Sequence, residues 1–385
     1  MKAIIIGAGI GGMSTALALG RCGYDAEVYE AVKEIKPVGA AISVWPNGVK
    51  CLNYLGLRDA VKALGGNMAW MAYRDFVSGN DMTRFSMAPL VSRVGESPYP
   101  VARAELQQLL IDSYPAEKIH FGKRVCRVVQ DAEGVSVWFD DNSHARGDFL
   151  IAADGTHSVV REYVREIPTE RRYAGYVNWN GLVTIDESIA PADQWTTYVG
   201  EGKRVSLMPV SGNRFYFFFD VPLPKGLPED RSTVKEDLKG YFRGWAEPVQ
   251  RLIDTIDPQT TNRVEIHDIE PFMEFVKGRV ALLGDAAHST TPDIGQGGCA
   301  AMEDAVVLAS VLASHSLGIE DSLLRYQQRR NERVKDLILK ARKRCDVTHA
   351  KDPQVTAAWY QALTREDGVN VLAGMCETIE GGPLG

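Results

Sequence analysis

Apolar and polar residues follow two different patterns along this chain. The uninterrupted apolar run at 3–6 predicts a buried strand, and the segment 14–19, after a glycine-rich turn, predicts a helix. Two later apolar runs, 149–153 and 280–283, predict further strands of the same kind, because a continuous apolar run is typical of a parallel strand covered on both faces. The sequence therefore indicates an α/β core whose strands come from distant parts of the chain.

A second pattern, the alternation of apolar and polar residues with period two, fills much of the range 173–264. It is clearest at 176–185, 203–210 and 214–221, and the residues at 211–213 predict a hairpin turn between the last two strands. We expect an antiparallel sheet here that covers the α/β core.

The two patterns are interleaved along the sequence, which predicts two domains that exchange segments. The α/β domain is expected to comprise 1–72, 98–172 and 265–345, the antiparallel domain 73–97 and 173–264, and a helical tail 346–385. Apolar positions available for one face predict a helix over 324–344. The segment after residue 350 is expected to fray.

The first predicted strand leads into the glycine motif Gly7-Ala8-Gly9-Ile10-Gly11-Gly12. Gly7 would make the tight turn, Gly9 would let the backbone approach a pyrophosphate, and Gly12 would let the helix pack on the strand. The free N–H groups at the start of the helix favour a phosphate there. Glu30 ends the next strand, where an acid that binds a ribose is expected. The motif predicts a Rossmann-like domain with one dinucleotide site.

Two more motifs narrow the choice of dinucleotide. Asp154-Gly155 ends one buried strand, and Gly284-Asp285 ends another, before the glycine-rich turn 292–298. In their order and spacing the three motifs resemble the FAD-dependent aromatic hydroxylases, the group A flavoprotein monooxygenases. The resemblance runs from Met1 to about Arg344 and implies an α/β fold of the hydroxybenzoate-hydroxylase type with a C-terminal helix.

The resemblance also implies a cofactor site. In this family the Asp-Gly pair supports the pyrophosphate side, the Gly-Asp aspartate binds the ribityl chain, and the following turn lies against the flavin ring. It implies non-covalent FAD held by Gly7, Gly9, Gly11, Gly12, Glu30, Ala31, Ser43, Arg103, Val125, Asp154, Asp285, Gly295, Gly297, Gly298 and Cys299. No second glycine motif is found, so NADH is expected as a co-substrate that docks transiently.

The resemblance further implies that reduced flavin reacts with O2 to a C4a-hydroperoxide, which attacks an electron-rich carbon of an aromatic anion. Alternation on the predicted roof strands places Asn178, Arg204 and Tyr216 toward one cavity, beside the ring of Phe218. We interpret the first three as catalytic and all four as substrate-binding, because an amide, a guanidinium and a phenol suit a flat anion with several N–H and C=O groups. The alternative is that polar positions on half-exposed strands simply face water.

Within this family, the stretches 176–181 and 215–219 are similar to the bacterial FAD-dependent urate hydroxylases. That similarity implies hydroxylation of urate at C5 to 5-hydroxyisourate in purine breakdown. Two alternatives stay open. One is a hydroxylase of a phenolic acid such as salicylate or hydroxybenzoate. The other is a flavin oxidase or reductase without oxygen insertion, or a flavin-dependent sensor without turnover.

Composition agrees with such an enzyme. The 385 residues are 45% hydrophobic, enough to bury a large core, and the net charge of −7 does not predict a nucleic-acid partner. The six cysteines show no CxxC spacing and the seven histidines no HExxH pair, so no metal site is expected. The first strand follows Met1 almost at once and no apolar run reaches the length of a membrane span. A cytoplasmic enzyme without a membrane partner is therefore expected.

Overall fold

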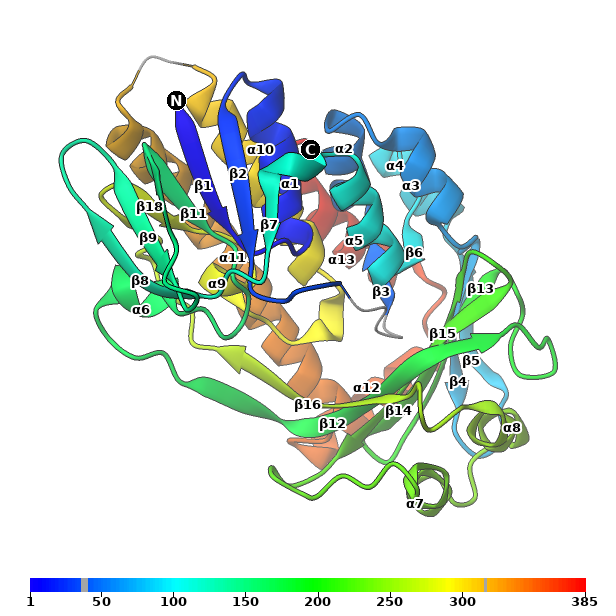
Figure 1. Ribbon diagram of the computed structural model, residues 1–385. Helices are drawn as coiled ribbons and strands as arrows, with labels where there is room; N and C mark the ends of the chain where they lie inside the picture. Colours follow the sequence, from blue (N-terminus) through cyan, green and yellow to red (C-terminus); the bar gives the residue numbers. More distant parts are fainter. Residues whose placement is uncertain (36–40, 315–316) are drawn as a thin grey trace.

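The computed structural model describes residues 1–35, 41–314 and 317–385. Two large sheets dominate the fold, with a six-stranded sheet at the upper left of Figure 1 and a seven-stranded sheet at the lower right. The long helix α11 (Ile319–Thr348) connects them: Tyr326 donates to the carbonyl of Leu282 in the first sheet, and Arg342 pairs with Asp268 in the second.

The six-stranded sheet contains the buried strands expected from the apolar runs. Its order is β17 (Val276–Lys277), β18 (Val280–Leu282), β11 (Phe149–Ala152), β1 (Lys2–Ile6), β2 (Asp25–Glu30) and β7 (Ile119–Phe121). All neighbours pair in parallel except β17 and β18. Residues 149–152 are fully buried, as expected for a parallel strand covered on both faces.

Helices cover this sheet and bring its motifs together. The helices around it are α1 (Ile10–Arg21), α5 (Arg103–Asp112), α6 (Val160–Arg165), α9 (Asp285–His288) and α10 (Gly297–Leu312). The turn before α1 requires glycine, because Gly7 has φ +101° and a Cβ there would lie 2.3 Å from the carbonyl oxygen of Ala153. At Gly12 a Cβ would lie 1.9 Å from the carbonyl oxygen of Gly7. Both glycines therefore set the close approach of turn, strand and helix.

Smaller elements flank the six-stranded sheet. They are the three-stranded antiparallel sheet β8 (Val125–Gln130), β9 (Val135–Phe139) and β10 (His144–Gly147), the pair β3 (Ala41–Val44) and β6 (Tyr99–Ala102), the helices α2 (Pro46–Tyr54), α3 (Arg58–Leu64) and α4 (Ala88–Val94), and the short turn η1 (Ala116–Lys118). The pair β3–β6 lies next to the cavity described below, through Ala41, Ile42 and Ser43.

The seven-stranded sheet is the one predicted from period-two alternation. Its order is β16 (Asn262–Ile269), β12 (Arg171–Thr184), β15 (Arg214–Pro222), β14 (Lys203–Val210), β13 (Gln194–Gly200), β4 (Trp70–Asp75) and β5 (Asp81–Ser86). It is antiparallel except for the β13–β4 pair. The hairpin turn at 211–213 is present as expected. One face of the sheet packs Phe215, Phe217 and Phe219 against α7 (Val234–Tyr241) and α8 (Glu247–Thr255).

The ends of this sheet extend past the segments expected from the sequence. β4 begins at Trp70, before residue 73, and β16 ends at Ile269, after residue 264. Both differences arise because the strands pair beyond the stretch in which alternation is visible. The division of the chain into functional domains stays a prediction.

The tail is more ordered than expected. Instead of fraying, residues after 350 form α12 (Pro353–Leu363) and α13 (Val369–Glu380). Several polar contacts dock α13: Arg93 forms a bidentate pair with Glu380 at 2.6 Å, Arg333 donates to the carbonyl of Thr378 at 2.7 Å, and Lys340 donates to the Thr378 hydroxyl at 2.5 Å. Within the described ranges no helix is long and apolar enough to cross a membrane.

Candidate active site

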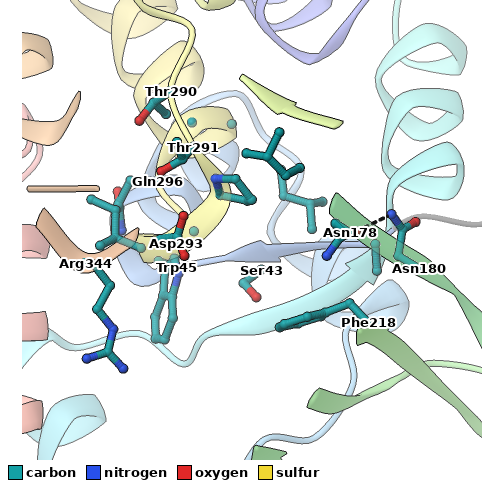
Figure 2. A pocket seen from close by; sticks show the side chains of 18 of the residues that line it. Ser43, Trp45, Asn178, Asn180, Phe218, Thr290, Thr291, Asp293, Gln296 and Arg344 are labelled. Atoms are coloured by element: carbon teal, nitrogen blue, oxygen red, sulfur yellow. Dashed lines mark hydrogen bonds between the residues drawn. The ribbon is translucent and has the colours of Figure 1, made fainter. Parts of the chain in front are cut away.

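A cavity of about 880 Å³ lies between the two large sheets. Its wall takes residues from the glycine motif, β3, the turn η2 (Pro292–Ile294), the start of α10, the open face of the seven-stranded sheet and the C-terminal helices. Figure 2 shows Asn178, Asn180 and Phe218 on one side of this space and Asp293 and Gln296 on the other. The cavity thus joins the motifs of the α/β core to the expected substrate strands.

The glycine motif forms one end of the cavity. Gly9 faces open space, since a Cβ at this position would meet no atom within 4 Å. The Glu30 carboxylate accepts from the backbone N–H of Ala8 at 2.7 Å and of Val32 at 2.9 Å. The Glu30 side chain therefore binds the backbone of the glycine motif, next to which it was expected to lie.

The two residues of the Asp-Gly motif are placed differently with respect to the cavity. Gly155 lines the cavity, whereas the Asp154 carboxylate accepts from the N–H groups of Val159 and Val160 at the start of α6. Burial raises the pKa of Asp154 despite these hydrogen bonds. The Asp154 side chain thus holds the turn that presents Gly155 to the cavity.

The Gly-Asp motif presents a free carboxylate to the cavity. Asp285 is exposed on the cavity wall, and its carboxylate has no hydrogen-bond partner among the residues that the structure describes. The turn behind it is fixed, because Asp304 accepts from the N–H of Gly284 at 2.9 Å and from Nε2 of His288 at 2.6 Å. His288 is thereby a buried structural partner.

A buried group of charges anchors this motif. We call Glu303, Asp304, Arg330 and Arg333 the motif cluster. Arg330 donates to Asp304 at 2.6 Å and pairs with Glu303 at 2.9 Å, and Arg333 pairs with Glu303 at 3.0 Å. Burial would raise the pKa of both carboxyls, but the neighbouring cations outweigh it and lower both. The cluster holds α11 against α10, and so fixes the start of α10.

The four residues expected on the substrate strands all line the cavity. Asn178, Arg204, Tyr216 and Phe218 lie on its wall, together with Asn180 and Met208. Asn180 donates to the side-chain oxygen of Asn178 at 2.6 Å, the dashed line in Figure 2, and Asn178 donates to Asp220 at 2.5 Å. Period-two alternation therefore separated the cavity face from the packed face correctly.

Arg204 is held between two carboxylates. Its Nε donates to Asp220 at 2.7 Å, its Nη2 lies 3.3 Å from Asp293, and its guanidinium carbon lies 5.1 Å from the ring centre of Phe218. Burial would lower the pKa of Arg204, but Asp220 and Asp293 outweigh it and raise the pKa, so the guanidinium stays charged. Burial and Asp220 also raise the pKa of Tyr216, which stays a phenol.

The sequence assigned no role to three residues of this ion group. Asp220 and Asp293 pair with Arg204, and His349 pairs with Asp293. His349 lies at the end of α11 with Nε2 3.5 Å from Asp293. Asp220 could have been found, because a three-residue turn at 211–213 sets Arg204 opposite Asp220 in the hairpin.

One group of potential metal ligands occurs in the part of the chain that the structure describes: Asp293, Cys345 and His349, with ligand atoms within 4.8 Å of one another. The Asp293 carboxylate already accepts from Tyr176 at 3.0 Å and pairs with Arg204. Burial raises the pKa of the Cys345 thiol, which therefore stays protonated. These observations favour an ion cluster over a metal centre.

The residues expected to hold FAD divide into two sets. The cavity wall includes Gly9, Gly11, Ser43, Arg103, Asp285, Gly295, Gly297 and Gly298. The other expected residues are not part of this wall: Gly7, Gly12, Glu30, Ala31, Val125, Asp154 and Cys299. Cys299 contacts the carbonyl of the wall residue Ser43 at 3.8 Å, whereas Val125 packs in the core that contains Tyr29.

The cavity has the features that FAD requires. Open space at Gly9 next to the start of α1 leaves room for a pyrophosphate. The free carboxylate of Asp285 can accept from ribityl hydroxyls, and the start of α10 at Gly297 presents N–H groups to a flavin ring. The residues present therefore fit the cofactor.

Comparison with known proteins agrees with this geometry. The family described as FAD binding domain matches residues 1–341. The chain is 65% identical to the FAD-dependent urate hydroxylase of Klebsiella pneumoniae, covering 100% of both chains. It is 57% identical to that of Mycolicibacterium vanbaalenii, covering 100% of this chain and 98% of the relative. The fold and site define a flavin-dependent aromatic hydroxylase. Within that class, the chain belongs to the family of the FAD-dependent urate hydroxylases.

Solved structures extend the comparison. HpxO from Klebsiella pneumoniae, complexed with FAD and uric acid, superposes with a TM-score of 0.98 at 64% identity, covering 100% of this chain and 98% of that chain. An R204Q variant of HpxO, complexed with FAD, also superposes with a TM-score of 0.98. A salicylate hydroxylase with a TM-score of 0.77 is only 23% identical and shares the fold alone.

Proposed function

We propose that this protein is an FAD-dependent monooxygenase that hydroxylates urate. The observation that carries the proposal is the cavity, in which the cation of Arg204 and the amide of Asn178 face the same space as the free carboxylate of Asp285. The crystal structure of a 64% identical relative in complex with FAD and uric acid supports it. We infer a cytoplasmic enzyme without nucleic-acid or membrane partners.

The wall matches the chemistry of urate, a flat anion with alternating N–H and C=O groups. The guanidinium of Arg204 supplies charge and donors, and the amides of Asn178 and Asn180 supply both donors and acceptors. Phe218 offers an apolar face for a planar ring. Tyr216 adds a phenol that stays protonated, because burial and Asp220 raise its pKa. We propose Asn178, Arg204 and Tyr216 as the catalytic residues and Phe218 as a further substrate contact.

Bound FAD would supply the redox chemistry, taking hydride from NADH and delivering one oxygen atom of O2 through a C4a-hydroperoxide. The product on this proposal is 5-hydroxyisourate, formed at C5. The task of the chain is to hold the anion with that carbon toward the flavin and to exclude water. The residues proposed to hold FAD are the expected set, with Asp285 on the ribityl hydroxyls and the α1 and α10 starts on the pyrophosphate and the ring.

The test is NADH oxidation by the FAD-loaded enzyme against urate, xanthine, salicylate and 4-hydroxybenzoate, with product analysis. We expect urate to accelerate both flavin reduction in stopped flow and steady NADH use, and to yield 5-hydroxyisourate. Turnover with salicylate or 4-hydroxybenzoate but not urate would favour a phenolic-acid hydroxylase. Anaerobic bleaching of the flavin by substrate without NADH would favour an oxidase.

A further inference from the structure

Arg204, the cation of the proposed substrate site, belongs to a buried group that we call the substrate-face cluster: Arg204, Asp220, Asp293 and His349. The side chains of Asp220 and Asp293 have no exposed area, and those of His349 and Arg204 have only 4% and 10%. Water therefore screens these charges little, so their sum matters to any ion that binds beside them.

The three members other than His349 carry a net negative charge. Two carboxylates flank a single guanidinium, with Arg204 2.6 Å from Asp220 and 3.3 Å from Asp293. The Asp293 carboxylate accepts from the hydroxyl of Tyr176 at 3.0 Å and pairs with Arg204 at 3.3 Å, contacts that hold it as the anion without His349. The cavity wall also carries Arg103 and Arg344, but directly around Arg204 these three charges sum to −1, which weakens the attraction of Arg204 for an anion.

The surroundings of His349 decide whether that excess is compensated. Its Nδ1 lies 3.2 Å from the carbonyl oxygen of Gly202, and its Nε2 lies 3.5 Å from Oδ1 of Asp293. Both neighbours accept hydrogen bonds and neither donates. A neutral imidazole carries one N–H, so it would direct a lone pair at one of these oxygens. An imidazolium has a proton for each.

Two further ionisable groups near this ring, Tyr176 and Cys345, are neutral. Tyr176 stacks on it with ring centres 3.8 Å apart, and burial and Asp293 raise the pKa of its phenol. Burial and Asp293 likewise raise the pKa of the Cys345 thiol, one turn earlier on α11. Neither group contributes charge near neutral pH, so His349 is the member of this group that can add a second positive charge, beside that of Arg204, next to Asp293.

We propose that His349 is a positioning residue held as the imidazolium cation, which neutralises Asp293 and so leaves the charge of Arg204 available to the anionic substrate. The cluster then carries two positive and two negative charges. The role of His349 is indirect, because it does not line the cavity and acts through Asp293 and Arg204. This inference rests on the proposed urate hydroxylase function.

The first experiment reads the charge directly, by nitrogen NMR of histidine-labelled, FAD-loaded enzyme at neutral pH, with His349→Gln used to assign the signal. We expect both ring nitrogens of His349 to show the shifts of protonated imidazolium. Shifts of a neutral or metal-bound ring would overturn the proposal. This measurement needs no substrate, so it stands even if urate proves to be the wrong anion.

The second experiment measures urate binding to the FAD-loaded enzyme by calorimetry without NADH. His349→Gln keeps a donor but loses the charge, and we expect a loss of affinity of about tenfold or more. Adding Asp293→Asn to that variant restores a net charge of zero and should recover most of the loss. The matched control is His144→Gln, at an exposed position on β10, which should leave urate affinity unchanged.

The outcomes separate the two proposals. Parent enzyme that does not bind urate would contradict the proposed function. Parent that binds urate while His349→Gln binds it equally well would overturn this inference. A double variant that is no better than His349→Gln would show that packing matters and charge does not, and would overturn it too. Should His349→Gln fail to fold, the nitrogen shifts of the parent, assigned by pH titration, still decide.

Discussion

The motif cluster and the substrate-face cluster are built from similar parts and differ in what they face. In the first, two guanidinium groups balance two carboxylates, and the members lie behind the cavity wall. In the second, one guanidinium lies between two carboxylates and is itself on the cavity wall. The charges of the motif cluster are used on partners inside the protein. In the substrate-face cluster, Arg204 lies on the cavity wall and can also bind an anionic ligand.

The two clusters therefore have different roles: the motif cluster holds a backbone turn in place, and the substrate-face cluster presents side chains to a ligand. Asp304 uses its oxygens on Arg330, His288 and the N–H of Gly284, so its hydrogen bonds fix the turn that presents Asp285. Asp220 uses its oxygens on Asn178 and Arg204, which both face the cavity. Removing a charge should therefore damage folding in the first cluster and substrate chemistry in the second.

Arg330→Met should have the largest effect. It leaves Glu303 and Asp304 buried with too little positive charge, and breaking a buried ion pair from one side costs about 3–5 kcal/mol. We expect a loss of that size in the free energy of unfolding, measured in urea, together with weaker FAD retention. Arg329→Met, at the exposed neighbouring position of α11, is the control and should stay near the parent. Parent-like stability of Arg330→Met would mean that this cluster does not anchor the motif.

Arg204→Gln should leave the fold intact and damage the chemistry. It keeps a donor but loses the charge and the fork, and a misplacement of about 1 Å can cost on the order of a hundredfold in rate. We expect FAD binding and reduction by NADH to persist, while product formed per NADH falls and hydrogen peroxide rises. Lys203→Gln, on the same strand and paired with Glu201 away from the cavity, is the control. An unchanged product ratio with unchanged urate affinity would remove Arg204 from the site.

Asp285→Ala should act on the cofactor alone. Loss of a charged acceptor for the ribityl hydroxyls costs about 1.5–3 kcal/mol, equivalent to roughly tenfold to a hundredfold in FAD affinity. Titration of apoprotein with FAD, followed by flavin fluorescence, measures it. Asp336→Ala, at an exposed position of α11, serves as the control. Full affinity in Asp285→Ala would contradict the assigned contact, as would release of FMN in place of FAD from the parent.

Acid should weaken the substrate-face cluster. The pKa of Asp293 is lowered to about 2 in the folded chain, below the value of about 3.9 for an unfolded aspartate. Because the pKa is lower in the folded chain, the ionised carboxylate adds on the order of 2 kcal/mol to the free energy of unfolding above about pH 4. This contribution is lost as the pH falls toward 2. Urea unfolding at several pH values measures this slope. Asp293→Asn should flatten it in that range, and an identical slope in the variant would exclude Asp293 as its source.

The parts of the fold and site that could be predicted are those set by local pattern. Gly7 and Gly12 mark a turn because no side chain fits there, and Arg204, Tyr216 and Phe218 share a face because a strand alternates strictly. Asp285 was expected from a motif in the same way, and it lies on the cavity wall.

The parts that were missed depend on packing between distant elements. His349 contacts Gly202 and Asp293 only because the end of α11 reaches the seven-stranded sheet, and no periodicity encodes that approach. Arg330 is one of many basic residues of α11, yet its side chain is only 2% exposed. The carboxylates that pair with it belong to α10, and no motif in the sequence marks them.

The order of strands in the six-stranded sheet has a consequence for synthesis on the ribosome. Ala3 pairs beside Ala26, which is made soon after it, but its other neighbour is Phe149, and Leu150 in turn pairs beside Val280, so the sheet is completed only after β18 has emerged. Contacts this remote in sequence slow folding and leave apolar strands uncovered in the nascent chain. Chaperones that bind exposed strands should therefore meet this protein early. Chains that stop before α11 should be degraded, since the motif cluster cannot close without Arg330.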